Sequence, residues 1–303
     1  MKKRNMVLVF LLVLTFSLTG CGSGTASSDD NTVTPAKSTP KNSNTASDTP
    51  VEEESPDAAI EEQLLIDQEG VKITAVSLEE DGFFGPEVKL KIENTTDKNI
   101  TVQTLDTSIN GLMIEPTLSC NVAAGMQAND VMAFYTVDLE NNGIEKIASI
   151  EFKFNIFETD SYDTILVTDA ITLDTAAKDG YVQAYDDTGE VILDSNDIKI
   201  VAKGLVTDDL MGPEIKLYIE NNSKTGITVE TQNFSINGIM VSPITYSAVL
   251  PGKKANTEIS FYDLEENGIE DISNAEFSFH IADSATYDTI LDSDVIALTF
   301  SAE

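Results

Sequence analysis

Several stretches of this chain alternate between apolar and polar residues with the period of two that is typical of β-strands. The alternation runs through residues 88–92, 150–156 and 275–281, where an apolar residue occupies every second position. Successive side chains of a strand point to opposite faces, so each stretch has one apolar face and one polar face. Antiparallel strands that cover a core and meet water on the other side have such faces. The pattern therefore predicts an all-β fold.

The chain also contains an internal duplication. Residues 85–116 are identical at 18 of 32 positions to the residues 127 places later, and residues 162–166 recur 125 places later. Agreement of this extent indicates two copies of one unit. Each copy spans about 110 residues, the size of a domain that folds alone rather than of a solenoid repeat. We place the copies at residues 64–174 and 191–303, with a linker at 175–190 in which residues 181–185 are a candidate edge strand.

Asn-Gly pairs mark a hairpin in each copy. Asn110-Gly111 and Asn237-Gly238 each lie between short apolar runs. Asparagine and glycine tolerate the positive φ angles of a type I′ turn, which joins two adjacent antiparallel strands. We expect about seven or eight strands per copy, at the spacing that is typical of a sandwich. Each copy is therefore predicted to be an antiparallel β-sandwich.

The motif Ile92-Glu93-Asn94, its counterpart Ile219-Glu220-Asn221 and the Asn-Gly hairpins resemble those of a known class of domain. They are similar to the immunoglobulin-like extracellular domains of Gram-positive, especially clostridial, lipoproteins, in a telokin-like group that includes a mycobacterial immunoprotective antigen. The resemblance implies two tandem immunoglobulin-like sandwiches outside the cell, and it implies no catalytic residues. The chain has no tryptophan, so the core Trp of antibody domains is absent.

The N-terminus has the features of a signal peptide, residues 1–20. Three basic residues precede an apolar run from Met6 to Leu18. As a helix this run would be about 20 Å long, which is too short for the ~30 Å hydrocarbon core of a membrane. Leu18-Thr19-Gly20-Cys21 resembles a bacterial lipobox. That resemblance implies a diacylglyceryl thioether on Cys21 and a place on the outer face of the cell membrane; an ordinary secretory signal is the alternative.

The segment after the leader and the overall charge limit the partners. Residues 21–63 are rich in Ser, Thr, Asn, Asp and Pro, and such a segment buries too little surface to offset its ordering entropy, so we expect a disordered acidic linker. The chain carries a formal net charge of −34, and its single arginine, Arg4, belongs to the leader. Nucleic acid would repel such a polyanion. The expected partners are the membrane, through the lipid, and a protein or cell-wall polymer.

Residue types that support enzyme chemistry are scarce. His280 is the only histidine, and asparagine takes its place in the first copy. A Ser-His-Asp or Cys-His site would depend on this one residue, and two cysteines with one histidine are too few for a zinc site. Cys120 has no cysteine to pair with once Cys21 carries lipid, and we expect it to be a small buried residue. We predict a non-enzymatic protein, with a carboxylate-based hydrolase as the least favoured alternative.

Two short segments, residues 138–144 and 263–269, interrupt the strand pattern. Each is typical of one helical turn that begins at a capping aspartate and ends at a left-handed glycine. The same residues match positions 1, 3 and 5 of an EF-hand loop, but the bidentate glutamate of position 12 is missing. Calcium is therefore the alternative, and no other cofactor is expected. The candidate ligands are Asp138, Glu140 and Asn142 in the first copy and Asp263, Glu265 and Asn267 in the second.

The loop before each Gly-Pro pair is the best candidate for a binding surface. It holds two bulky apolar residues among acidic ones: Phe83 and Phe84 in the first copy, Leu210 and Met211 in the second. Exposed at a loop tip, such residues would form an interaction surface. Folded back, they would close one end of the sandwich. Bulky residues in such loops more often fold back, so we favour the closed arrangement and keep the interaction surface as the alternative.

Together these features predict a membrane-anchored extracellular lipoprotein that binds a protein or cell-wall component through its two domains. A structural spacer or an accessory subunit of an envelope complex is the alternative. A calcium-dependent surface module is a lesser one.

Overall fold

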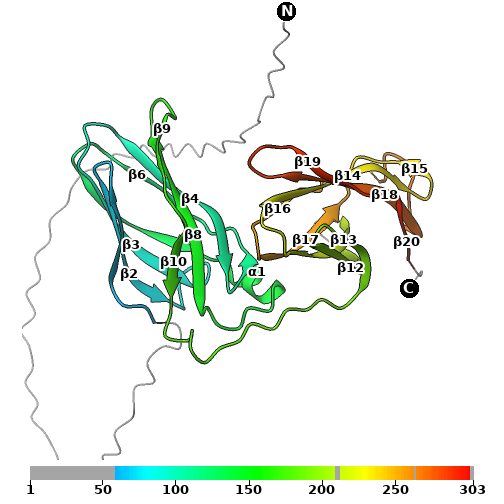
Figure 1. Cartoon of the computed structure of the whole chain (residues 1–303), viewed down its shortest axis with the longest axis horizontal. Helices are drawn as coiled ribbons and strands as arrows, with labels where there is room; N and C mark the ends of the chain where they lie inside the picture. Colours follow the sequence, from blue (N-terminus) through cyan, green and yellow to red (C-terminus); the bar gives the residue numbers. More distant parts are fainter. Residues whose placement is uncertain (1–58, 209–211, 263, 301–303) are drawn as a thin grey trace, which may run out of the picture. The chain divides into compact units, whose positions relative to one another are not determined.

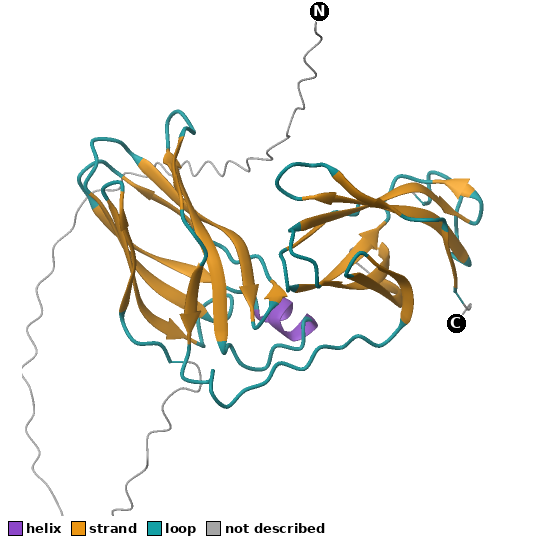
Figure 2. Ribbon diagram, viewed as in Figure 1, coloured by secondary structure: helices purple, strands orange, loops and turns teal. Residues whose placement is uncertain are grey.

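The computed structural model describes residues 59–208, 212–262 and 264–300, and the structural statements below refer to these residues (Figure 1). The predicted leader, Cys21, Leu210, Met211 and Asp263 lie outside them. The described chain is mostly β-strand with one short α-helix, in agreement with the alternating pattern (Figure 2). The described residues contain no helix that is long and apolar enough to cross a membrane.

The first repeat forms two antiparallel sheets that face each other across one core. Its elements are β1 (Gln63–Gln68), β2 (Val71–Glu79), β3 (Glu87–Asn94), β4 (Ile100–Ile109), β5 (Leu112–Met113), β6 (Ser119–Val122), β7 (Gln127–Ala133), α1 (Thr136–Asn141), β8 (Ser149–Glu158), β9 (Thr164–Val167) and β10 (Ile171–Asp174). One sheet has the order β1-β2-β3-β7, and the other has the order β10-β8-β4-β5, with β6 beside β4 and β9 beside β8. Buried residues from both sheets form a single hydrophobic cluster.

The second repeat has the same arrangement and its own hydrophobic cluster. Its strands are β11 (Glu190–Ser195), β12 (Ile198–Asp208), β13 (Gly212–Asn221), β14 (Ile227–Ile236), β15 (Ile239–Met240), β16 (Ser247–Val249), β17 (Lys254–Ser260), β18 (Asn274–Asp283), β19 (Thr289–Asp292) and β20 (Ile296–Thr299). The sheets have the orders β11-β12-β13-β17 and β15-β14-β18-β19, with β16 beside β14 and β20 beside β18. Each repeat has ten described strands rather than seven or eight, because two-residue strands such as β5 show no alternation.

The predicted alternation identifies the core residues correctly. On β8, the four apolar residues from Ile150 to Ile156 are fully buried while the residues between them are partly exposed. Burying a large apolar side chain contributes roughly 1.5–3 kcal/mol, so these positions dominate the packing. Cys120 on β6 is buried as predicted. Burial raises the pKa of its thiol to about 12, and the thiol is therefore protonated and unreactive at neutral pH.

Both Asn-Gly pairs form the predicted hairpins. Asn110 and Gly111 have φ angles of 50° and 86°, and Asn237 and Gly238 have φ angles of 52° and 78°. Two successive positive φ angles are characteristic of a type I′ turn. The first pair joins β4 to β5, and the second joins β14 to β15.

The predicted helical turns differ from the structure at their starts. Helix α1 begins after Tyr135 and no side chain caps it, so Asp138 lies in the first turn and is not the cap. Asp138 therefore stabilises the helix only through its charge near the N-terminus. Gly143 follows the helix with the expected positive φ of 62°. In the second repeat, the residues before Gly268 form turns rather than a helix.

The asparagine that ends each Ile-Glu-Asn motif organises the same turn in both repeats. The Nδ2 group of Asn94 donates to the carbonyl oxygens of Lys98 and Val122, at 2.8 and 3.0 Å. Asn221 donates in the same way to the carbonyl oxygens of Thr225 and Val249, both at 2.8 Å. Both asparagine side chains are buried. A buried amide must find partners for its polar atoms, and here those partners tie the end of β3 to β6 and the end of β13 to β16.

The two repeats meet at a surface that we call the repeat junction. It joins the hairpin tip at residues 111–113 to the start of β17, where the backbone N–H of Lys254 donates to the carbonyl oxygen of Gly111 at 2.9 Å. Leu112 pairs with Lys254 in a parallel bridge and is only 1% exposed. Met113 packs against the core cluster of the second repeat. The tip therefore contacts the second repeat through the apolar side chain of Met113 and through one backbone hydrogen bond, next to the buried Leu112.

The linker is held by side chains and does not form the predicted edge strand at residues 181–185. The Oε1 atom of Gln183 accepts a hydrogen bond from Asn110 at 3.0 Å, and its Nε2 group donates to the carbonyl oxygen of Gly143 at 2.9 Å. The hydroxyl of Tyr185 donates to the carbonyl oxygen of Asn110 at 2.7 Å. The linker thus binds to the hairpin tip without a backbone ladder.

Candidate functional site

We define the aromatic loop as Phe83 and Phe84, which lie between β2 and β3, together with Tyr135, which lies just before α1. The backbone N–H of Thr136 donates to the carbonyl oxygen of Phe84 at 3.0 Å. Gly85 follows with a φ of 138°, a conformation that glycine adopts without strain. This turn directs the two phenylalanines away from β3 and fixes them beside Tyr135.

The phenylalanines of the aromatic loop are exposed. Phe83 is 91% exposed and Phe84 is 50% exposed. The ring of Phe84 packs edge-on against Phe83, with centroids 4.8 Å apart, and against Tyr135, at 5.2 Å. Three contacting rings on a surface form the kind of anchor that dominates protein interfaces. The favoured expectation, in which these residues fold back and close the end of the sandwich, is wrong for Phe83.

Acidic residues and a small hollow surround the aromatic loop. Glu80 and Asp81 precede the phenylalanines and are exposed. Glu80 also borders a hollow of about 190 Å³ whose lining includes the buried residues Leu139, Ile144 and Ile147. The rim of this hollow also holds Glu145 and Lys146, so an apolar floor lies beside charges of both signs.

The second repeat keeps part of the aromatic loop. Tyr262, the counterpart of Tyr135, is exposed. Leu210 and Met211, which take the places of the two phenylalanines, lie outside the described residues. The structure therefore supports the surface only in the first repeat.

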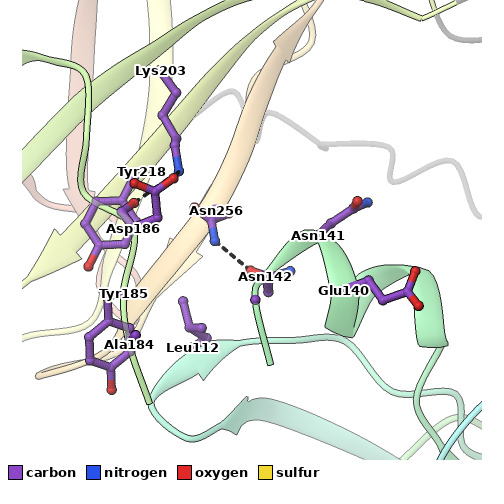
Figure 3. Close-up of a pocket in the computed structure, with 11 residues that line it drawn as sticks. Leu112, Glu140, Asn141, Asn142, Ala184, Tyr185, Asp186, Lys203, Tyr218 and Asn256 are labelled. Atoms are coloured by element: carbon purple, nitrogen blue, oxygen red, sulfur yellow. Dashed lines mark hydrogen bonds and ion pairs between the residues drawn. The ribbon is translucent and has the colours of Figure 1, made fainter. Parts of the chain in front are cut away.

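A polar cleft of about 260 Å³ lies at the repeat junction (Figure 3). The end of α1 contributes Glu140, Asn141 and Asn142 on one side, and the linker contributes Tyr185 and Asp186 on the other (Figure 3). The sequence does not indicate this cleft, because its walls come from segments that are far apart in the chain and share no motif.

The cleft holds several buried polar groups. The Nδ2 group of Asn256 donates to Oδ1 of Asn142 at 2.9 Å, while Oδ1 of Asn256 is buried and has no hydrogen-bond partner among the described residues. Burial also raises the pKa of the Tyr218 hydroxyl, which is therefore protonated and donates to Glu220 at 3.0 Å. The free acceptor on Asn256 would suit a ligand or water with an O–H or N–H donor.

The candidate calcium ligands of the first repeat have other roles. Oδ1 of Asn142 accepts the bond from Asn256, and its Nδ2 group donates to the carbonyl oxygen of Asp138 at 2.8 Å. Glu140 lines the polar cleft. Of the second set, Glu265 and Asn267 lie in a turn. Among the described residues, no group of three or more His, Cys, Asp or Glu side chains is placed to hold a metal ion.

His280 makes a contact across two strands. Its Nδ1 atom lies 2.6 Å from Oδ1 of Asp292, and β18 and β19 pair these two residues directly. A cross-strand pair of this kind stabilises a sheet. The geometry gives the histidine a structural partner on the neighbouring strand.

Comparisons with known proteins yield likenesses to solved structures alone. No family model and no curated protein matches this sequence. Among solved structures, the chain is similar to the Salmonella enterica SafA pilin in complex with the SafB chaperone, with 11% sequence identity and a TM-score of 0.20 over 71% of this chain and 89% of that chain. A likeness at this TM-score is distant, and we infer no function from it.

Proposed function

We propose that this protein is a non-enzymatic, lipid-anchored extracellular binding protein, with two immunoglobulin-like sandwiches, that contacts a protein or cell-wall polymer through the aromatic loop. The observation that carries the proposal is the exposure of Phe83 and Phe84 beside Tyr135. Exposing such rings to water is unfavourable by roughly 25 cal/mol per Å² of apolar surface. A partner that covers them would recover this free energy.

The surroundings of the aromatic loop define the chemistry of the partner. Glu80 and Asp81 are exposed, and the chain as a whole carries a formal net charge of −34. Complementary charge accelerates encounter and excludes acidic competitors. We therefore favour a partner with an apolar patch flanked by lysine or arginine side chains or by free amino groups.

Replacing Phe83 and Phe84 together with serine is expected to weaken binding to this partner at least thirtyfold. Loss of a buried aromatic anchor costs about 2 kcal/mol or more at an interface, whereas the exposed rings contribute little to folding. The measurement is quantitative binding of the purified variant to isolated cell walls and to envelope protein fractions. Replacing the exposed Val167 and Val182 with serine is the matched control and leaves binding unchanged. A large fall in melting temperature of the first variant, with binding retained per folded molecule, would count against the proposal.

Replacing Cys21 with serine is expected to release the protein from the membrane into the medium. Each buried methylene of an acyl chain contributes about 0.8 kcal/mol to membrane affinity, and two chains suffice for stable anchoring. Membrane fractionation and mass spectrometry of the mature N-terminus measure the change. Cys120→Ser is the control, because Cys120 is buried in the first repeat, and this variant remains anchored. Unchanged fractionation of Cys21→Ser would exclude the lipid anchor.

A structural spacer is the second candidate function, and the repeat junction favours it. Besides the backbone bond to Gly111, the junction contains an ion pair between Lys253 and Glu151 at 3.1 Å and the bond between Asn142 and Asn256. Contacts of this kind restrict the motion between domains. A spacer would keep its envelope complex intact when the aromatic loop is replaced, which distinguishes it from a binding protein.

A further inference from the structure

The repeat junction joins two surfaces that each occur twice in this chain. The hairpin tip at residues 111–113 has its counterpart at residues 238–240, which we call the free tip. The start of β17, residues 254–256, has its counterpart at residues 127–129 on β7, which we call the free edge. Among the described strands, β7 has only β3 as a ladder partner apart from an isolated bridge at Ala133.

Apolar side chains that the junction covers in the first repeat are exposed on the free tip. Leu112, which the core of its own repeat and the junction cover together, is 1% exposed, whereas its counterpart Ile239 is 40% exposed. Met113 packs against the core of the second repeat, whereas Met240 is 63% exposed. The duplication thus shows what covers such a tip: the start of the outer strand of the next repeat.

The polar groups of the junction are also present on the free surfaces. The Asn142–Asn256 hydrogen bond has counterparts in Asn267 and Asn129, which are again two asparagines. The hydrogen bond that a backbone N–H of β17 donates to Gly111 uses main-chain groups alone, so it does not depend on side-chain identity. The main-chain hydrogen bond and the pair of asparagines are therefore the parts of the junction that both surfaces retain.

We propose that this protein associates head to tail with further copies of itself, with the free tip of one copy docked on the free edge of the next. The contact reproduces the repeat junction between molecules. It is heterologous, because two different surfaces meet, and each added copy presents a new free tip. Heterologous contacts that do not close into a ring extend as open assemblies.

The association between molecules is weaker than the junction within one. The ion pair of Lys253 with Glu151 has no counterpart, since Met126 and Glu276 take those places. The linker, which raises the effective concentration of the two surfaces, is also missing between molecules. Mutual repulsion at a net charge of −34 opposes contact, and salt screens it. Association therefore increases with ionic strength.

Cross-linking of the full chain tests this proposal. Cys21→Ser and Cys120→Ser remove the native thiols, and Asn129→Cys with Asn267→Cys introduces one thiol on each proposed partner surface. A short bismaleimide at high salt is expected to give a series of dimers, trimers and larger species on a denaturing gel. An equal mixture of the two single-cysteine chains is expected to give dimers only. Oligomers no more abundant than those of each single-cysteine chain alone would overturn the proposal.

Two controls separate head-to-tail contact from random collision and from misfolding. Asn142→Cys with Asn256→Cys, at the repeat junction itself, cross-links within one molecule and gives monomers. Adding Ile239→Asp and Met240→Asp to the first variant abolishes the oligomers, whereas Val167→Asp with Val206→Asp, which adds the same charge at two other exposed residues, leaves them. Circular dichroism verifies that each variant is folded. Oligomers that survive the two aspartates in a folded chain would also overturn the proposal.

Discussion

Asn94→Ala is expected to destabilise the first repeat by about 3–4 kcal/mol. The substitution removes the amide that donates to Lys98 and Val122, and it also removes the Oδ1 acceptor for the backbone N–H and the hydroxyl of Thr96, at 3.0 and 2.7 Å. Each buried polar group left without a partner costs about 1–3 kcal/mol. Thermal and urea unfolding, followed by circular dichroism, measure the loss.

Matched substitutions isolate this effect. Asn221→Ala removes the same network from the second repeat and is expected to cost a similar amount. Asn129→Ala, on the surface of β7, is expected to change the free energy of unfolding by less than about 0.5 kcal/mol. Equal stability of the Asn94→Ala and Asn129→Ala variants would contradict the assigned role of the buried amide.

For this asparagine, the sequence identifies the position but not its hydrogen-bond partners. The motif Ile-Glu-Asn stands in both repeats, so comparison of the repeats alone marks the position. Its function depends on carbonyl oxygens that lie 28 residues away in sequence, at Val122 and at Val249. No local pattern carries that information, because β3 and β6 belong to different sheets and approach each other only in the folded chain.

The strands and hairpins were predictable because they depend on local chemistry. An alternation of period two places all apolar side chains on one face only if the segment is a strand. Asn-Gly permits the two positive φ angles of the hairpin. The prediction of an edge strand in the linker was wrong. Residues 181–185 contain the aromatic and β-branched residues that strands favour. Instead, Gln183 and Tyr185 bind the hairpin tip through their side chains, and no backbone ladder forms.

The candidate site was predictable in composition but not in geometry. Phe83 and Phe84 stand out in sequence as bulky residues among acids, yet the sequence favoured their folding back against the sandwich, and both are exposed. The contact with Tyr135, which is about fifty residues later in sequence, and the backbone conformation of Gly85 hold them at the surface. The polar cleft could not be predicted, because it exists only where the two repeats meet.

Gly85→Ala is expected to disrupt the aromatic loop without altering either phenylalanine. At its φ of 138°, an added Cβ would lie 2.6 Å from the carbonyl oxygen of Phe134 and 2.8 Å from the backbone nitrogen of Thr136. These contacts are with backbone atoms, which cannot rotate away. Strain of this kind together with overpacking costs about 3–5 kcal/mol. Relief of the clash requires the loop to separate from the segment before α1, which breaks the bond between Thr136 and Phe84.

Gly125→Ala is the matched control, because Gly125 also has a positive φ, 69°, but an added Cβ would meet no atom within 4 Å. It is expected to cost about 1–2 kcal/mol from the left-handed conformation alone. Thermal unfolding compares the two variants, and binding to cell walls or envelope proteins at a temperature where both are folded compares their surfaces. Loss of binding in Gly85→Ala alone would mean that the placement of the rings matters, beyond their hydrophobicity. Equal binding by both variants would show that the partner does not recognise the loop in this conformation.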